Sequence, residues 1–126
     1  MSPPFLILLI EDEPVIRELV SSMLTEEGVV VECAADGAEG LKLARARAFD
    51  LVLLDVVLPK LDGITTLRML KADALTRGVP VYMLTGRTKK ADVSTAMAAG
   101  ADGYIQKPFR GAELMDLVDR LRAAKA

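Results

Sequence analysis

The feature that most constrains the fold is a fivefold alternation of short apolar runs with longer amphipathic segments. The runs over 5–10, 29–34, 51–54, 79–84 and 103–106 are short enough for strands. The run "LVLL" at 51–54 is apolar at every position, which is typical of a strand buried on both faces of a parallel sheet. The segments between the runs place apolar residues at helical spacing, and we predict helices from Pro14 to a stop at Gly28 and over 38–46, 63–74, 89–99 and 112–124.

Strands that alternate with helices predict an α/β fold, in which a parallel sheet is covered by helices on both faces. Right-handed connections between parallel strands favour a doubly wound, flavodoxin-like (βα)5 arrangement with the strand order 2-1-3-4-5. The 126 residues contain neither a repeat nor a linker, so we expect a single domain over 1–126.

Composition excludes several kinds of chemistry. The chain has no histidine and a single cysteine, Cys33, which excludes Ser-His and Cys-His catalysis, histidine-ligated metals, a phosphohistidine carrier and an internal disulfide. A net charge of −2 gives no indication of a nucleic acid or an anionic membrane as a direct partner. The first apolar run is too short to span a membrane and is followed by acidic residues, so we expect a cytoplasmic protein.

Polar side chains stand where four of the predicted strands end. Glu11 and Asp12 follow the first strand, Asp55 the third, Thr85 the fourth and Lys107 the fifth. The carboxyl ends of parallel strands meet at one edge of the sheet, where ligands bind in this class of fold. We therefore expect three carboxylates, a hydroxyl and an ammonium group to converge on one crevice.

This set of groups fits phosphoryl transfer. Three adjacent carboxylates repel one another unless a cation lies among them, and a site with only oxygen ligands suits Mg²⁺. A carboxylate such as Asp55 can attack phosphorus to give an aspartyl phosphate. Mg²⁺, Lys107 and the Thr85 hydroxyl would then neutralise the transferred oxygens.

At this point the chain resembles the receiver domain of bacterial two-component response regulators. The motifs "IED", "LLDVVLPKLDG", "LTG" and "GADGYIQKPF" occur in order over essentially the whole chain, and the ordered set is far more specific than any one of them. The resemblance implies that Asp55 accepts a phosphoryl group from a sensor histidine kinase or a histidine phosphotransfer protein. It also implies that Glu11, Asp12, Asp55 and the backbone carbonyl of Val57 hold Mg²⁺, with Asp12 favoured over Glu11 as the direct ligand.

The same resemblance implies a switch. Thr85 and Lys107 would bind the phosphoryl oxygens, the Lys107–Pro108 bond would be cis, and Thr85 would move together with the ring of Tyr104. This movement would change the surface of the fourth helix, fifth strand and fifth helix for a downstream protein or output domain. The candidate residues of that surface are Lys89, Lys90, Tyr104, Arg110 and Glu113. Such a module would catalyse its own phosphorylation and dephosphorylation without being a metabolic enzyme, and Val57 with Arg87 would favour slow dephosphorylation.

Each of these residues also has an ordinary structural interpretation. Asp55 could be a solvated strand end, the acids before Pro14 a helix start, Lys107 a turn lysine and Tyr104 a half-buried strand tyrosine. Asp62 and Gly63 are best explained as the start of the third helix, where the aspartate caps it.

The sequence argues against three rival functions. A phosphatase of the haloacid dehalogenase type should carry a second aspartate two residues after the nucleophile, where this chain has Val57. A flavodoxin should carry a phosphate-binding loop after the first strand, where this chain has "EDEP". A degenerate receiver that binds partners without phosphorylation would not need the full set of site residues. The sequence leaves open whether the receiver stands alone or belongs to a longer protein.

Overall fold

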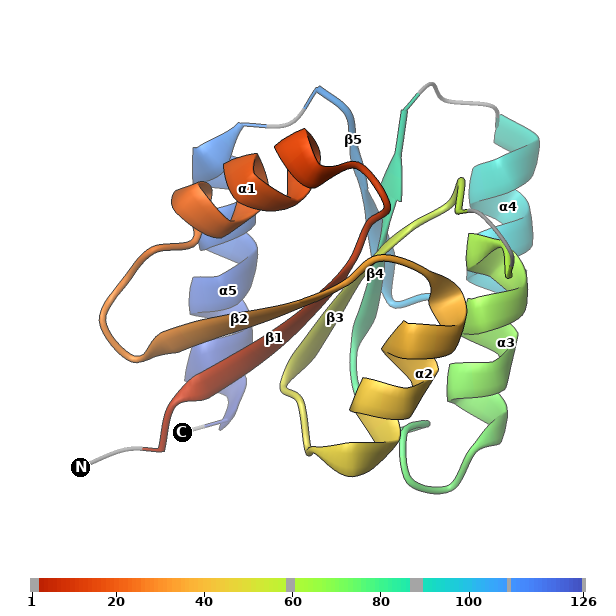
Figure 1. Cartoon of the computed structure of the whole chain (residues 1–126), viewed down its shortest axis with the longest axis horizontal. Coiled ribbons are helices and arrows are strands. Elements are labelled where there is room, and N and C mark those ends of the chain that lie inside the picture. Colours follow the sequence, from red (N-terminus) through yellow and green to blue (C-terminus); the bar gives the residue numbers. More distant parts are fainter. Residues whose placement is uncertain (1–2, 59–60, 87–89, 109, 126) are drawn as a thin grey trace.

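Five strands form one parallel sheet between two layers of helices (Figure 1). The computed structural model describes residues 3–58, 61–86, 90–108 and 110–125. The strand order is β2-β1-β3-β4-β5, with every neighbouring pair parallel, which confirms the predicted α/β flavodoxin-like arrangement. Along the chain the elements are β1 (Phe5–Ile10), α1 (Pro14–Met23), β2 (Val29–Ala34), α2 (Gly37–Ala46), β3 (Leu51–Asp55), α3 (Gly63–Ala72), β4 (Val81–Thr85), α4 (Lys90–Ala98), β5 (Gly103–Gln106) and α5 (Gly111–Lys125).

The sheet has a hydrophobic core on each face. Helices α1 and α5 cover one face, and α2, α3 and α4 cover the other (Figure 1). Successive strand residues alternate between the faces, so Ile7 and Leu9 of β1 pack with α1 and α5, whereas Leu8 and Ile10 pack toward the other helices. All four side chains are fully buried, which explains why the central strands are apolar at every position. In the described ranges no helix combines the length and the apolarity needed to cross a membrane.

The start of α3 is fixed by Asp62 and Gly63, as predicted. The Asp62 carboxylate accepts the Thr65 N–H at 2.8 Å, and this hydrogen bond holds the pKa of Asp62 below its usual value. A Cβ on Gly63 would lie 2.2 Å from the carbonyl oxygen of Asp55, so only glycine allows this close approach. The pair therefore ties the start of α3 to the end of β3.

Three predicted boundaries are wrong by two residues or more. Helix α1 ends at Met23, well before Gly28, which instead has a φ of 83° and turns the chain into β2. Strand β4 begins at Val81 and not at residue 79, because Pro80 has no N–H for the ladder and the Val79 N–H bonds to Thr76 in a turn. Helix α3 ends at residue 72 instead of 74, because residue 73 adopts an extended conformation.

Candidate functional site

The predicted site residues lie where four neighbouring strands end. Asp55 and Thr85 are the last residues of β3 and β4, one residue further along each strand than the sequence indicated. Glu11 directly follows β1, and Lys107 directly follows β5. The Lys107 N–H donates to the Thr85 carbonyl at 2.6 Å, which ties the ends of β4 and β5 together. The Lys107–Pro108 peptide bond, which carries the chain away from the site, is cis.

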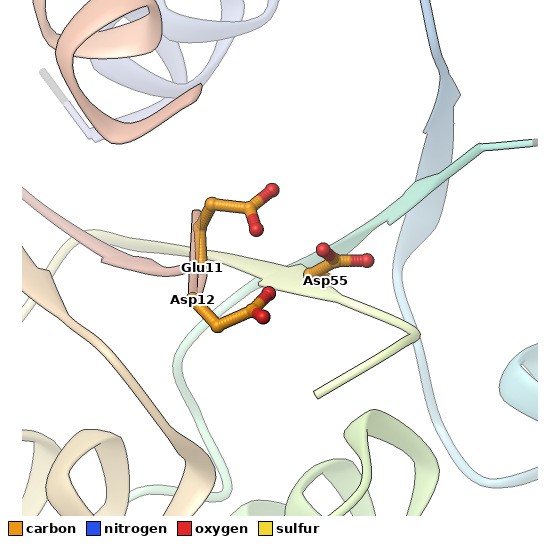
Figure 2. Close-up of side chains that lie close together, drawn as sticks. All are labelled: Glu11, Asp12 and Asp55. Atoms are coloured by element: carbon orange, nitrogen blue, oxygen red, sulfur yellow. The ribbon is translucent and has the colours of Figure 1, made fainter. Parts of the chain in front are cut away.

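Glu11, Asp12 and Asp55 form an acidic cluster (Figure 2). One carboxylate oxygen from each of the three residues lies within 4.8 Å of the other two. Glu11 is fully buried and Asp55 is 6% exposed, so two of the three charges are largely withdrawn from water. Such an arrangement is unfavourable without compensating positive charge.

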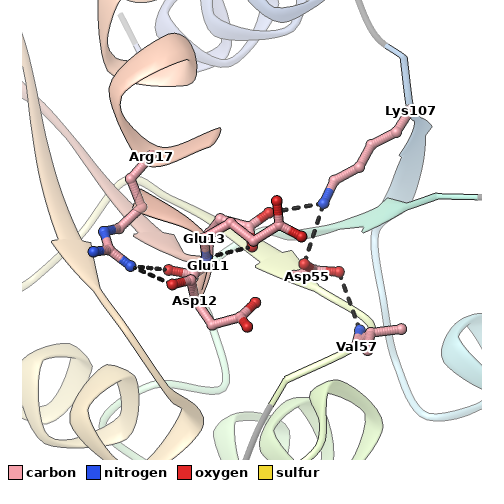
Figure 3. Close-up of polar contacts among 7 residues, drawn as sticks. All are labelled: Glu11, Asp12, Glu13, Arg17, Asp55, Val57 and Lys107. Atoms are coloured by element: carbon pink, nitrogen blue, oxygen red, sulfur yellow. Dashed lines mark hydrogen bonds and ion pairs between the residues drawn. The ribbon is translucent and has the colours of Figure 1, made fainter. Parts of the chain in front are cut away.

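Lys107 supplies part of that compensation (Figure 3). Its Nζ lies 2.7 Å from Glu11 Oε1 and 3.1 Å from Asp55 Oδ2. Burial alone would lower the pKa of Lys107, but the hydrogen bond to Glu11 and the charges of Asp55 and Glu11 outweigh burial and raise this pKa. The Lys107 side chain therefore stays protonated and positively charged at neutral pH. Because the cluster has three carboxylates and only this one ammonium group, an excess of negative charge remains.

The excess charge fits a divalent cation that prefers oxygen ligands. Among the described residues, no side chain forms an ion pair with the carboxylate of Asp12, which is the most exposed of the three acids. The donor set consists of carboxylate oxygens at an open edge of the sheet, which is the chemistry that suits Mg²⁺. Glu11, Asp12 and Asp55 are the residues that could hold such an ion.

Backbone groups orient two of the carboxylates. The Val57 N–H donates to Asp55 Oδ1 at 3.0 Å, so that the two oxygens of Asp55 have different partners. The Glu13 N–H donates to Glu11 Oε2 at 3.2 Å. The side chain of Val57 is 76% exposed beside the site. A role of the Val57 carbonyl as a metal ligand stays a prediction.

Thr85 carries a buried hydroxyl group without a partner. The residue is 3% exposed, and its Oγ1 makes no hydrogen bond within the described part of the chain. Buried polar atoms are rarely left in this state, because losing water without a replacement costs about 1–3 kcal/mol. The hydroxyl is therefore ready for an acceptor that reaches the site from outside.

Sequence reasoning missed Arg17. This half-buried side chain on α1 donates from one guanidinium nitrogen to the carbonyl oxygens of Glu11 at 2.9 Å and Asp12 at 2.8 Å (Figure 3). Backbone carbonyls have no residue-type signature, so the only available signal was an arginine early in the helix that follows the acids.

The residues predicted for the partner surface are described in part. Tyr104 on β5 is 48% exposed, and Arg110 and Glu113 are exposed near the start of α5. Lys90 begins α4, but its side chain, like Arg87 and Lys89 as a whole, lies outside the described residues.

A cleft with a volume of about 310 Å³ opens next to the site. It is lined by Ile16, Leu19, Gly86, Lys107 and Pro108, so Lys107 belongs both to the cleft and to the acidic cluster. Leu19 on α1 lines this cleft and is 45% exposed.

Comparison with known proteins finds curated relatives that are about twice as long as this chain. The DNA-binding response regulator MtrA of Mycolicibacterium smegmatis is 41% identical over 93% of this chain and 49% of its own length. The transcriptional regulatory protein CseB of Streptomyces coelicolor is 43% identical over 93% of this chain and 47% of its own length. The chain therefore spans about half the length of these relatives.

Solved structures match over nearly the whole chain. The receiver domain of the sensor histidine kinase PA1611 from Pseudomonas aeruginosa PAO1, with a magnesium ion in its active-site cleft, superposes with a TM-score of 0.86 at 35% identity, covering 94% of this chain and 97% of that one. The chemotaxis protein CheY4 of Vibrio cholerae gives 0.86 at 31% identity, covering 95% and 99%. The family model for the response regulator receiver domain matches residues 7–119. The chain thus belongs to the receiver domains of two-component response regulators, which are phosphorylation-dependent signalling switches.

Proposed function

We propose that Asp55 is the phosphoacceptor of this receiver and that the chain catalyses its own phosphorylation in the presence of Mg²⁺. The observation that carries the proposal is the arrangement around Asp55, whose two carboxylate oxygens are held by Lys107 and by the Val57 N–H beside two further carboxylates. Glu11, Asp12 and Asp55 would hold the ion, together with the Val57 carbonyl. When bound, Mg²⁺ supplies positive charge to the oxygens of the transferred group.

The chemical step is a displacement at phosphorus. An oxygen of Asp55 attacks the phosphorus of a phosphohistidine on the donor, the new O–P bond forms, and the P–N bond breaks with its electron pair leaving on the imidazole nitrogen. The ammonium group of Lys107 remains charged because of its raised pKa, and it turns from Asp55 to an oxygen of the phosphoryl group. Hydrolysis of the aspartyl phosphate by water later resets Asp55.

Thr85 and Tyr104 convert this step into a change of surface. The unpartnered Thr85 hydroxyl gains an acceptor when a phosphoryl oxygen is present, which favours a conformation in which it faces the site. Tyr104 is 48% exposed on the neighbouring strand, and its ring would move inward as Thr85 turns toward the site. The surface that changes includes Lys89, Lys90, Tyr104, Arg110 and Glu113, and it contacts a downstream protein or an output domain.

The donor is a sensor histidine kinase or a histidine phosphotransfer protein in the cytoplasm, and we place its docking surface at the cleft on α1. Leu19 lines this cleft and is 45% exposed, and Lys107 lines it too while pairing with Asp55. A helix with an apolar face fits such a groove and brings its histidine to the acidic cluster. The net charge of −2 argues against nucleic acid as a direct partner of this chain.

We also propose a long lifetime for the phosphoryl group on Asp55. The exposed Val57 side chain stands beside Asp55, where it hinders the approach of water, and this favours slow self-dephosphorylation.

The experiment that tests the proposal is phosphorylation by acetyl phosphate, followed by intact mass with and without Mg²⁺. We expect the mass of one phosphoryl group to be gained only with Mg²⁺ and to be absent in Asp55→Asn. Gain that persists in Asp55→Asn would identify a different acceptor. Binding of Mg²⁺ without any gain would favour a receiver that acts by binding alone, and turnover of a phosphomonoester would favour a phosphatase.

A further inference from the structure

Arg17 holds the backbone that carries two of the three acids. One of its guanidinium nitrogens donates to the carbonyl oxygens of Glu11 at 2.9 Å and of Asp12 at 2.8 Å. Figure 3 shows Arg17 on one side of this backbone segment, and Asp55 with Lys107 on the other. The carbonyl groups are thereby turned away from the acidic cluster, whereas the carboxylates are left to face it.

This contact matters most for Asp12. Lys107 pairs with Glu11 and Asp55, but within the described ranges no cation or backbone N–H holds the Asp12 carboxylate. Its position depends on the two peptide planes on either side of its Cα, and these are the planes whose carbonyl groups Arg17 fixes. A charged donor makes each of these hydrogen bonds stronger than a neutral donor would.

We infer that Arg17 is a positioning residue for divalent-cation binding, because it pre-sets the Glu11–Asp12 backbone so that Asp12 meets the ion without further ordering. This inference rests on the proposed function, in which Glu11, Asp12 and Asp55 hold Mg²⁺. Groups that do not touch the metal but hold its ligands by hydrogen bonds typically contribute 10–100-fold to metal affinity. Two carbonyl contacts to one partly exposed side chain place the expected effect at the lower end, about tenfold.

Two other roles for Arg17 predict different results. If Arg17 acted only through its charge, removing it would tighten Mg²⁺ binding, since a nearby cation repels a dication. If Arg17 only stabilised the fold, its loss would lower the free energy of unfolding but leave the Mg²⁺ affinity of the folded protein unchanged. Only the positioning role predicts that a variant without Arg17 stays folded and binds Mg²⁺ more weakly than wild type.

The test is calorimetric titration of the phosphodonor-free chain with Mg²⁺. The proteins compared are wild type, Arg17→Met, Arg17→Lys and a matched control, Arg120→Met, which removes an exposed charge from α5. We expect the Kd to rise about tenfold in Arg17→Met, to rise less in Arg17→Lys because an ammonium is a point charge on a different stem, and to stay unchanged in Arg120→Met. Phosphorylation by acetyl phosphate should slow in Arg17→Met at low Mg²⁺ and recover at saturating Mg²⁺.

An unchanged or lower Kd in folded Arg17→Met, with wild type binding normally, would overturn the inference and leave the proposed function standing. If Arg17→Met does not fold, Arg17→Lys decides: about threefold weaker binding supports positioning, and binding equal to or tighter than wild type overturns it. Absence of Mg²⁺ binding by wild type would overturn the metal part of the proposed function itself.

Discussion

Removal of the Lys107 ammonium group should destabilise the chain by an amount that depends on Mg²⁺. With an effective dielectric constant of about 20, the two contacts of 2.7 and 3.1 Å correspond to gross attractions of roughly 6 and 5 kcal/mol. Most of this is offset by the cost of taking the charges out of water, and breaking a buried pair costs a net of about 3–5 kcal/mol. The Lys107 side chain is 21% exposed at an open edge of the sheet, so we expect about 2 kcal/mol for Lys107→Met.

The assay is urea unfolding of wild type and Lys107→Met, in EDTA and in millimolar Mg²⁺ at neutral pH. The loss of about 2 kcal/mol should appear in EDTA and shrink in Mg²⁺, since a bound dication replaces the missing charge and stabilises the folded state. Lys125→Met is the matched control, because Lys125 pairs with Asp50, which directly precedes β3 and so lies at the opposite end of that strand from Asp55. Its effect on stability should not depend on Mg²⁺.

The pH dependence has a defined sign. The pKa of Lys107 is raised in the folded state, so its contribution to stability is fully present below the unfolded-state pKa and is lost as the pH rises through the folded-state value. The difference between wild type and Lys107→Met should therefore close only at pH values above the ordinary lysine pKa of 10.5. A variant as stable as wild type in EDTA, or more stable, would refute the reasoning, since desolvation of the ammonium would then exceed its attraction to the acids.

Three further predictions concern other parts of the molecule. Asp62→Ala should lose about 1 kcal/mol in urea unfolding at neutral pH, with Asp62→Asn near wild type. Because the Asp62 pKa is lowered, the part of this loss that depends on the negative charge should shrink as the pH falls from the usual value of 3.8 through the lower folded-state value. Gly40→Ala should lower the free energy of unfolding by about 1–3 kcal/mol in the same assay, since a Cβ at this position would lie 2.4 Å from Ile10 Cδ1. Gly78→Ala is the control and should have no such effect, because a Cβ there would meet no atom within 4 Å. Leu19→Glu should slow phosphotransfer from a histidine phosphotransfer protein, but phosphorylation by acetyl phosphate should be unchanged; equal slowing of both would argue against docking at the cleft.

The architecture could be predicted because its signals are local and repeated. Runs such as Leu51 to Leu54 can be buried only between two helical layers. Because all strands are parallel, the polar residues that follow them lie at the same end of the sheet. The positions of Glu11, Asp55 and Lys107 followed from that geometry alone. Boundaries were harder, because helix ends fray and α1 ends at Met23, several residues before the Gly28 that the sequence offered as its stop.

Other features of the site could not be predicted from residue types. The contacts of Arg17 go to backbone carbonyls, which every residue possesses, so only the path of the chain shows them. The missing partner of the Thr85 hydroxyl is likewise a property of the folded environment, since threonine at a strand end is ordinary in a sequence.

The ion pair between Lys107 and Glu11 joins residues that are 96 positions apart in the chain. As a polypeptide is synthesised, Glu11, Asp12 and Asp55 all emerge before Lys107 and β5. Contacts of such long sequence separation form only at the cost of the entropy lost when the long intervening loop is closed. Until β5 completes the sheet, the three acids lack their ammonium partner, so an unfinished or truncated chain cannot hold the assembled site. The complete group of three carboxylates and one ammonium therefore exists only when β1, β3 and β5 belong to the same sheet.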